Sequence, residues 1–307
     1  MRVILVSPRG FCAGVNMAIE TLDRAIERFG TPIYAYHEIV HNKWVVDRFR
    51  ALGVVFVDSL EDVPVGARLV FSAHGVSPTI RRLAAERRLR TIDATCPLVT
   101  KVHREAVRFA AEGYTIILIG HAGHDEVVGT LGEAPEAIRL VGSVDEVDAV
   151  EVADPNRVAY LTQTTLSVAD ANVIVERLQR RFPKLVGPPR ADICYATQNR
   201  QDAVLQGAAE ADVVLVVGSQ NSSNSQRLAE LARASGRPAY LIDGPEDIDP
   251  SWFRGNETVL ITAGASAPES VVQQCVKLLE DRYHARLEQV KVRDEEMRFA
   301  LPREVRE

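Results

Sequence analysis

The stretch RTIDATCPLVTKVHREA, residues 90–106, holds a single cysteine at the boundary between a predicted strand and a predicted helix. The short apolar run that ends at Ala94 predicts the strand. Pro97 predicts the first turn of the helix, where proline costs no hydrogen bond. Cys96 lies between them without a CxxC partner. Because a packing cysteine lies more often inside an apolar face, this position indicates a function.

The same arrangement recurs twice more in the chain. The segment RVILVSPRGFCAGVNMAIETLDRAIERFG carries Cys12, and ADICYATQNRQDAVLQGAAE carries Cys194. Each cysteine stands at a predicted strand-to-helix junction and precedes apolar residues three and four positions apart, as in an amphipathic helix. The three cysteines therefore mark three repeated units of roughly 85 to 100 residues, a size typical of small domains.

Each unit also contains two polar turns that connect a strand to a helix. The first type of turn reads HEIVHN, GHAGHDEV and GSQNSSNS, and the second reads SAHGVSP, TQTTLSV and TAGASAP. Strands that alternate with helices predict parallel sheets with helices on both faces, and such sheets bind ligands at the carboxyl ends of their strands. The predicted fold class is therefore α/β, with three similar small lobes and mostly parallel sheets around a pseudo-threefold axis and one central site.

The repeats predict where the chain divides. The expected parts are a first α/β lobe at 13–96, a second at 97–193, a third that joins 194–280 to the N-terminal strand 1–12, and a charged C-terminal extension at 281–307. The extension has no counterpart in the repeats, so no role is assigned to it.

The composition restricts the classes of function. Among 307 residues, 46% are hydrophobic and 25% are charged, and the net charge is −6, whereas a nucleic-acid partner usually requires a basic surface. The start MRVILVSPRG is too short for an export signal, and no apolar run approaches the roughly 20 residues of a membrane span. We therefore expect a cytoplasmic protein with reduced thiols, where cysteines indicate metal binding or catalysis more than disulfides.

The three cysteines allow more than one interpretation. Any one of them alone is more often a buried packing residue, but their recurrence at helix starts, which favour the thiolate, indicates a shared metal site. Three thiolates could bind zinc together with a histidine or water. They could also hold an iron–sulfur cluster with one iron left open for substrate. Cys275 lies within SVVQQCVKLLE at helical spacing from other apolar residues and is predicted to belong to the core.

The polar turns place hydroxyl, amide and imidazole groups beside the predicted cysteine site. Singly, serine and asparagine at such junctions are usually helix N-caps; together, at helix N-termini, they are equally well suited to bind an anion such as a diphosphate. The candidate residues are His41, His74, His124, Thr164, Ser222, Ser223, Asn224 and Ser266.

Glu126, in the turn GHAGHDEVVG, is the candidate proton donor. A carboxyl group shielded from water has the raised pKa that a donor needs, although an exposed glutamate in a first helical turn is the simpler interpretation. The remaining histidines of these segments, His37, His103 and His121, have no equivalents in the other units and are interpreted as structural or surface residues.

Nine segments, in chain order, resemble the signature segments of the 4-hydroxy-3-methylbut-2-enyl diphosphate reductase family. They are GFCAGV, HEIVHN, SAHGVSP, DATCPLV, GHAGHDEV, QTTLSV, DICYATQNRQ, GSQNSSNS and TAGASAP. The likeness runs in order from about residue 1 to about residue 280. The resemblance implies a three-lobed α/β fold around a central [4Fe–4S] cluster. The cluster ligands would be Cys12, Cys96 and Cys194, and one iron would lack a protein ligand.

The resemblance also implies the reaction. The family reduces (E)-4-hydroxy-3-methylbut-2-enyl diphosphate to isopentenyl and dimethylallyl diphosphate, the last step of non-mevalonate isoprenoid biosynthesis. The open iron would bind the substrate's hydroxyl oxygen, and two electrons and two protons would remove it as water through an allyl-type intermediate. By this match Glu126 relays protons, assisted by His124 and Thr164. The residues that hold the diphosphate would be His41, His74, Ser222, Ser223, Asn224 and Ser266.

The electrons would come from outside the chain. GFCAGV is not the G-x-G-x-x-G turn of a dinucleotide site, so a ferredoxin or flavodoxin is the implied donor. Two other functions compete with the reductase: a zinc hydrolase that acts on a phosphorylated substrate with Glu126 as its base, and a non-catalytic anion-binding or iron–sulfur sensor module.

Overall fold

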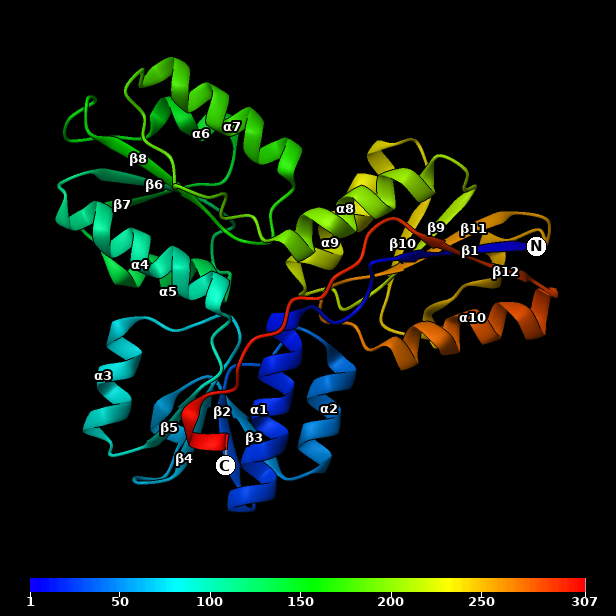
Figure 1. The fold of residues 1–307 in the computed structure, drawn as a ribbon, viewed down its shortest axis with the longest axis horizontal. Coiled ribbons are helices and arrows are strands. Elements are labelled where there is room, and N and C mark those ends of the chain that lie inside the picture. The colour runs from blue at the N-terminus through cyan, green and yellow to red at the C-terminus, as the bar shows by residue number, and fades with distance from the viewer. Residues whose placement is uncertain (307) are drawn as a thin grey trace. The chain divides into compact units, whose positions relative to one another are not determined.

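The computed structural model describes residues 1–306, which form three separate parallel β-sheets with helices packed against them (Figure 1). This confirms the predicted α/β class with three parallel-sheet lobes; their arrangement around a common axis and the predicted lobe boundaries stay predictions. The chain groups into two compact units. The first comprises Met1–Asn16, Val40–Phe49 and Tyr195–Arg298, and the second comprises Met17–Ile39, Arg50–Cys194 and the chain from Phe299 onward.

The first unit contains the largest sheet. Its strands, in spatial order, are β10 (Ala239–Ile242), β9 (Val213–Val217), β11 (Thr258–Ala263), β1 (Arg2–Ser7) and β12 (Arg286–Lys291). The all-apolar VVLVV of β9 is fully buried, as expected for a parallel strand covered on both faces. One face packs on α10 (Glu269–Tyr283), and the other packs on α8 (Tyr195–Ala208) and α9 (Ser223–Ala234).

The second unit contains two smaller sheets. One has the order β3 (Val54–Val57), β2 (Ile33–Tyr36), β4 (Arg68–Phe71) and β5 (Arg90–Asp93), and the other has the order β7 (Ile138–Val141), β6 (Thr115–Ile119) and β8 (Val158–Thr162). In the β7–β6–β8 sheet, one face packs on α4 and α5 and the other on α6 and α7, which gives two apolar cores. The helices of this unit are most of α1 (Ala13–Phe29) and all of α3 (Pro78–Glu86), α4 (Pro97–Ala111), α5 (Asp125–Glu133), α6 (Val144–Ala149) and α7 (Val168–Arg181). Most of α2 (Lys43–Ala51) belongs to the first unit.

The three sheets repeat one strand order. In each sheet, the first strand of the repeat lies in the middle, with the second strand on one side of it and the third on the other. These strands are β3–β2–β4, β7–β6–β8 and β10–β9–β11. The strand that leads toward a cysteine then lies beside the third strand, as β5 does beside β4 and β1 beside β11. The internal repeat inferred from the sequence is therefore visible in the topology.

Cys194 is the exception, because the structure places no strand before it. Only an isolated bridge, Ala159 to Val186, occupies the place of the expected strand. The residues that follow Val186 are Gly187, Pro188 and Pro189, and proline has no N–H with which to extend a ladder. The prediction of a strand-to-helix junction is wrong at this cysteine, although α8 does begin directly after it.

The segment that begins at residue 281 is not a detached extension. Its residues form β12, which pairs in parallel with β1 along the whole of that strand, and the N–H of Val292 donates to the carbonyl of Ser7 at 2.9 Å. Four short 3-10 helices complete the described chain: η1 (Leu60–Asp62), η2 (Pro245–Asp247), η3 (Pro250–Trp252) and η4 (Arg303–Val305). Among residues 1–306, no helix combines the length and the apolar character needed to cross a membrane.

Candidate functional site

Each of the three repeated cysteines directly precedes a helix: α1 after Cys12, α4 after Cys96 and α8 after Cys194. Their side chains are partly exposed and form no disulfide. In each case the cysteine N–H donates to a carbonyl in the turn that follows the neighbouring third strand. The bonds run from Cys12 to Ala265 (3.1 Å), from Cys96 to Ala73 (3.0 Å) and from Cys194 to Thr164 (3.0 Å).

These bonds tie each cysteine to a polar turn of the second type, namely TAGASAP, SAHGVSP or TQTTLSV. The same contact in all three copies shows that the cysteine positions are structurally equivalent, as their spacing predicted. Cys275 differs, because it is fully buried in the core of the first unit and burial raises the pKa of its thiol to about 12. The prediction that Cys275 is a core residue is confirmed.

Glu126 is buried in the first turn of α5, where it is only 2% exposed. Both of its carboxylate oxygens accept from Thr164: the backbone N–H donates to Oε1 at 2.6 Å and the hydroxyl donates to Oε2 at 2.9 Å. Since the carbonyl of Thr164 accepts from Cys194, one residue links the acid to a predicted cluster ligand. The alternative interpretation, an exposed glutamate in a first helical turn, is therefore wrong, and the candidate donor is shielded from water.

Burial raises the pKa of Glu126 to about 7, although the two hydrogen bonds from Thr164 act in the opposite direction. The charge of Asp192 adds to the rise. Asp192 is itself buried, and it forms an ion pair of 2.7 Å with Lys101 on α4. Glu126 is therefore close to half-protonated at neutral pH, as a proton donor requires.

The sequence analysis assigned no function to Asp125, which lies at the start of the same helix, or to His37, which contacts it. Asp125 accepts from Nδ1 of His37 at 2.7 Å and lies 3.8 Å from Nδ1 of His74. The ring of His74 contacts that of His124 edge-on at 5.9 Å between centroids. The hydrogen bond that His37 donates to Asp125 raises the pKa of His37. The carboxylate thus connects two imidazoles next to the predicted substrate residues, and His37 is not merely a surface residue.

His124 also caps α5, because its Nδ1 accepts from the N–H of Glu126 at 3.1 Å. An acceptor at Nδ1 means that the neutral ring carries its proton at Nε2. The capping bond therefore fixes the tautomer and leaves Nε2 as the donating atom.

The serine-rich turn of the first unit forms a compact hydroxyl cluster. Ser225 donates through its hydroxyl to Ser222 at 3.0 Å, and Ser222 lies 3.4 Å from the hydroxyl of Ser266. Ser266 in turn donates to the backbone carbonyl of His41 at 2.8 Å. The predicted diphosphate residues of this unit are therefore brought together, at the N-terminus of α9.

Two glycines allow this cluster to form. A Cβ at Gly264 would lie 1.9 Å from the hydroxyl oxygen of Ser225, and one at Gly218 would lie 2.2 Å from the same atom. The serine side chain therefore occupies space that any other residue at these two positions would fill.

Asn224 presents an unsatisfied donor in the same turn. Its Oδ1 accepts from the N–H of Ala265 at 2.9 Å, which fixes the orientation of the amide. Its Nδ2 is buried and has no hydrogen-bond partner among residues 1–306. A buried amide without a partner is costly, so this atom indicates an acceptor supplied by a ligand.

The described residues thus form two sets, each within its own unit. The first unit brings together His41, Ser222, Ser223, Asn224 and Ser266 with the Cys12 turn; the second brings together His74, His124, Glu126 and Thr164 with the turns of Cys96 and Cys194. The union of the two sets into one site stays a prediction.

The fold and these turns define a class: an α/β protein of three parallel-sheet repeats, with polar turns after its strands and a cysteine directly before a helix in each repeat. A family model described as LytB protein matches residues 3–280. The chain belongs to the LytB family.

Individual relatives agree with this. A protein from Rhodopirellula baltica, named 4-hydroxy-3-methylbut-2-enyl diphosphate reductase, is 58% identical over 100% of this chain and 96% of its own length. The solved structure of E-1-hydroxy-2-methyl-but-2-enyl-4-diphosphate reductase from Plasmodium falciparum has a TM-score of 0.96 at 40% identity, over 99% of this chain and 96% of that one. A structure of (E)-4-hydroxy-3-methyl-but-2-enyl diphosphate reductase, the terminal enzyme of the non-mevalonate pathway, has a TM-score of 0.64 at 29% identity, over 92% and 100%. The family resemblance read from the nine segments is confirmed.

Proposed function

We propose that this chain is an iron–sulfur reductase that removes the hydroxyl group of (E)-4-hydroxy-3-methylbut-2-enyl diphosphate as water. Two electrons and two protons enter, the C–O bond breaks, and a C–H bond forms to give isopentenyl or dimethylallyl diphosphate. The observation that carries the proposal is the buried carboxyl of Glu126, with a pKa of about 7, hydrogen-bonded to Thr164. Similarity along the whole chain to named reductases supports it.

The donor set fits a [4Fe–4S] cluster with one iron that lacks a protein ligand. Iron–sulfur clusters are held by cysteine thiolates, and helix N-termini of the kind that follow these three cysteines favour the thiolate. Of the four cysteines, the fourth is Cys275, whose buried thiol stays protonated in the core. Cys12, Cys96 and Cys194 would therefore hold the cluster. Once bound, it would supply the electrons and a Lewis-acidic iron for the substrate's hydroxyl oxygen.

The protein's own contribution begins with proton delivery. Glu126 is protonated in a large fraction of molecules at neutral pH, and the two bonds from Thr164 hold its carboxyl group in one orientation. After Glu126 releases its proton, the carboxylate still accepts from the N–H and the hydroxyl of Thr164, so it keeps its orientation. His124 assists from the N-cap of the same helix.

Diphosphate binding is assigned to the remaining polar residues. Asn224 offers its unpaired Nδ2, and the hydroxyls of Ser222, Ser223 and Ser266 lie at the N-terminus of α9, where free N–H groups favour anions. His41 and His74 are proposed to complete the binding site, together with His124 and Thr164. These groups bind an anion without an arginine or lysine clamp.

The two electrons are proposed to come from a ferredoxin or a flavodoxin in the cytoplasm. The test is conversion under anaerobic conditions. Purified chain, reconstituted with iron and sulfide, should be brown and should bleach on chemical reduction. Once reduced, it should convert the hydroxylated diphosphate into the two isomeric products. The zinc-loaded chain is the matched control and should stay inactive. Failure of the reduced, iron-loaded chain to form either product would overturn the proposal.

A further inference from the structure

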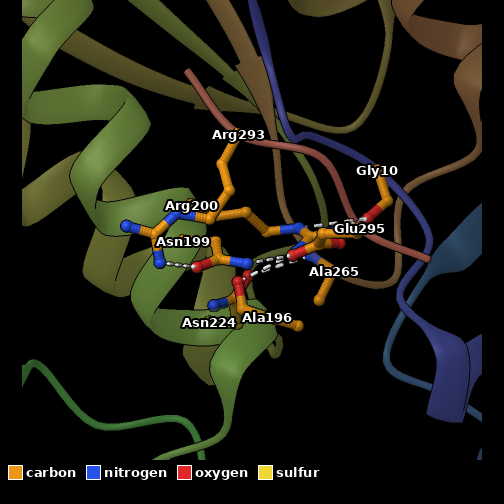
Figure 2. Close-up of polar contacts among 8 residues, drawn as sticks. All are labelled: Gly10, Ala196, Asn199, Arg200, Asn224, Ala265, Arg293 and Glu295. Carbon is orange, nitrogen blue, oxygen red and sulfur yellow. Dashed lines mark hydrogen bonds and ion pairs between the residues drawn. The ribbon is translucent and has the colours of Figure 1, made fainter. Parts of the chain in front are cut away.

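A buried arginine joins the Cys12 turn to the C-terminal part of the first unit (Figure 2). Arg200 lies on α8, six residues after Cys194, and is 0% exposed. Its Nη2 and Nε donate to the carbonyl oxygen of Gly10 at 2.7 and 3.2 Å. Gly10 precedes Cys12 by two residues, so the guanidinium group holds the backbone of the turn that carries this thiol.

Glu295, which follows β12 in the chain, holds the arginine in turn. Nη1 of Arg200 donates to both carboxylate oxygens at 3.0 and 3.1 Å, and Nη2 donates to Oε2 at 3.1 Å. Asn199 adds a bond of 2.9 Å from Nδ2 to Oε1 (Figure 2). Because a buried charge needs a counter-charge, Glu295 keeps the guanidinium in the position where it reaches Gly10.

The opposite side of the same turn is held by the end of β11. The N–H of Cys12 donates to Ala265, whose own N–H donates to Asn224. Gly10 has a φ of 66°, and a Cβ there would lie 3.2 Å from the carbonyl oxygen of Ala267. The turn that carries Cys12 is therefore held both by backbone hydrogen bonds to the residues after β11 and by the Arg200–Glu295 pair.

The second unit contains the same device. Lys101 lies on α4, five residues after Cys96, and its Nζ donates to Oδ1 of Asp192 at 2.7 Å and to the carbonyl of Arg190 at 2.6 Å. Asp192 precedes Cys194 by two residues. In both units a cation on the helix that starts at one cysteine thus holds the turn that leads into another.

We propose that the Glu295–Arg200 pair is a positioning device for Cys12: it orders the turn so that the thiolate stands in its binding position before the iron–sulfur group arrives. This inference rests on the proposed function for the identity of the group, but the ordering itself concerns the chain alone. Neither residue touches the reacting atoms, so both are positioning residues.

The test measures how well the turn protects its thiol in the full-length chain without metal. Iodoacetamide is added, and mass spectrometry follows the alkylation of each cysteine with time. Glu295→Gln keeps the side-chain volume but removes the charge, and we expect the rate at Cys12 to rise about tenfold, as for the loss of one charge-assisted contact. The rate at Cys96 should stay unchanged. Asp294→Asn is the matched control, because it makes the same change at the adjacent residue. The ion pair that Asp294 forms with Lys291 (2.5 Å) is exposed and contributes far less to stability.

A second variant guards against misfolding of the first. Arg200→Lys keeps a positive charge but cannot donate to the carbonyl of Gly10 and to the carboxylate with one planar fork, so it should expose Cys12 in the same way. Unchanged alkylation of Cys12 in a folded variant would overturn the proposal, and so would an equal rise at all three repeated cysteines, which indicates general loosening.

The iron-loaded chain provides the second readout. Release of iron to a chelator should be several-fold faster in Glu295→Gln than in the Asp294→Asn control. If the wild type binds no iron at all, the proposed function fails, whereas selective exposure of Cys12 would still establish the positioning role. If iron release and alkylation both match the control, the positioning role fails and the proposed function stands.

Discussion

Replacement of Glu126 by glutamine tests the central chemical feature of the second unit. The burial of this carboxyl raises its pKa from 4.5 to about 7, and glutamine removes the titration without a change of shape. The hydroxyl of Thr164 can rotate to accept from the new amide, while its N–H still donates to the remaining oxygen. We therefore expect Glu126→Gln to fold and to keep its iron.

The sign of the stability effect follows from the direction of the shift. A carboxyl whose pKa is raised on folding binds its proton more tightly in the folded chain. The contribution of this proton to the free energy of unfolding is about 3 kcal/mol. It is fully present below pH 4.5 and is lost as the pH rises through 7. Between pH 5 and pH 8 the wild type should therefore lose about 2–3 kcal/mol that the variant keeps.

The measurement is chemical denaturation of wild type and variant, both free of metal, at pH 5 and pH 8. Other titrating groups change the free energy of unfolding of both proteins alike. The difference between the wild type and the variant therefore reports on Glu126 alone. In the iron-loaded enzyme, loss of the proton donor should reduce turnover by about 100- to 10,000-fold. Identical pH dependence of stability in the two proteins would refute the burial argument, and near-wild-type turnover would exclude Glu126 as the donor.

Three further predictions follow from the same contacts. Cys96→Ala should lose bound iron, and four irons per chain in this variant, measured by chemical analysis, would contradict its role as a ligand. Asn224→Ala should raise KM for the diphosphate about tenfold and leave kcat nearly unchanged, since one hydrogen bond to the anion is lost. Steady-state kinetics that show a fall in kcat alone would contradict this. Lys101→Met should destabilise the chain by about 3 kcal/mol at pH 8, because the charge of Asp192 is left buried without its partner. The loss should be smaller at pH 5, where the carboxyl can bind a proton. Equal losses at both pH values in denaturation experiments would count against a charge effect.

The sequence was sufficient wherever local chemistry and the repeat agree. Pro97 fits only the first turn of a helix, and α4 begins there, directly after Cys96. The polar turns were found because each follows an apolar strand, and parallel strands place such turns at one edge of a sheet. The sequence made Glu126 a candidate donor, but an exposed first-turn glutamate fitted the same segment; the contact with Thr164, 38 residues away, decides between them.

The parts that could not be predicted depend on pairing between distant segments. The sequence RLEQVK of β12 has only two apolar residues, three positions apart, and lacks the alternation typical of a strand; only β1 as a neighbour makes it one. Glu295 stands in a charged run, and its partner Arg200 is 95 residues away. The role of Asp125 was hidden because its partner His37 has a left-handed backbone, with φ of 58°, that no pattern indicates.

The place of β1 in its sheet has a consequence for biosynthesis. This strand leaves the ribosome long before its two sheet neighbours, β11 and β12, are translated. The segment RVILVS must therefore wait, unpaired, until β11 and β12 have been made, and the closure of such distant contacts is slow. Chaperone binding to the nascent β1 should protect it during this interval, and the turn of Cys12 can form its hydrogen bonds to Ala265 and Arg200 only once those residues have been made.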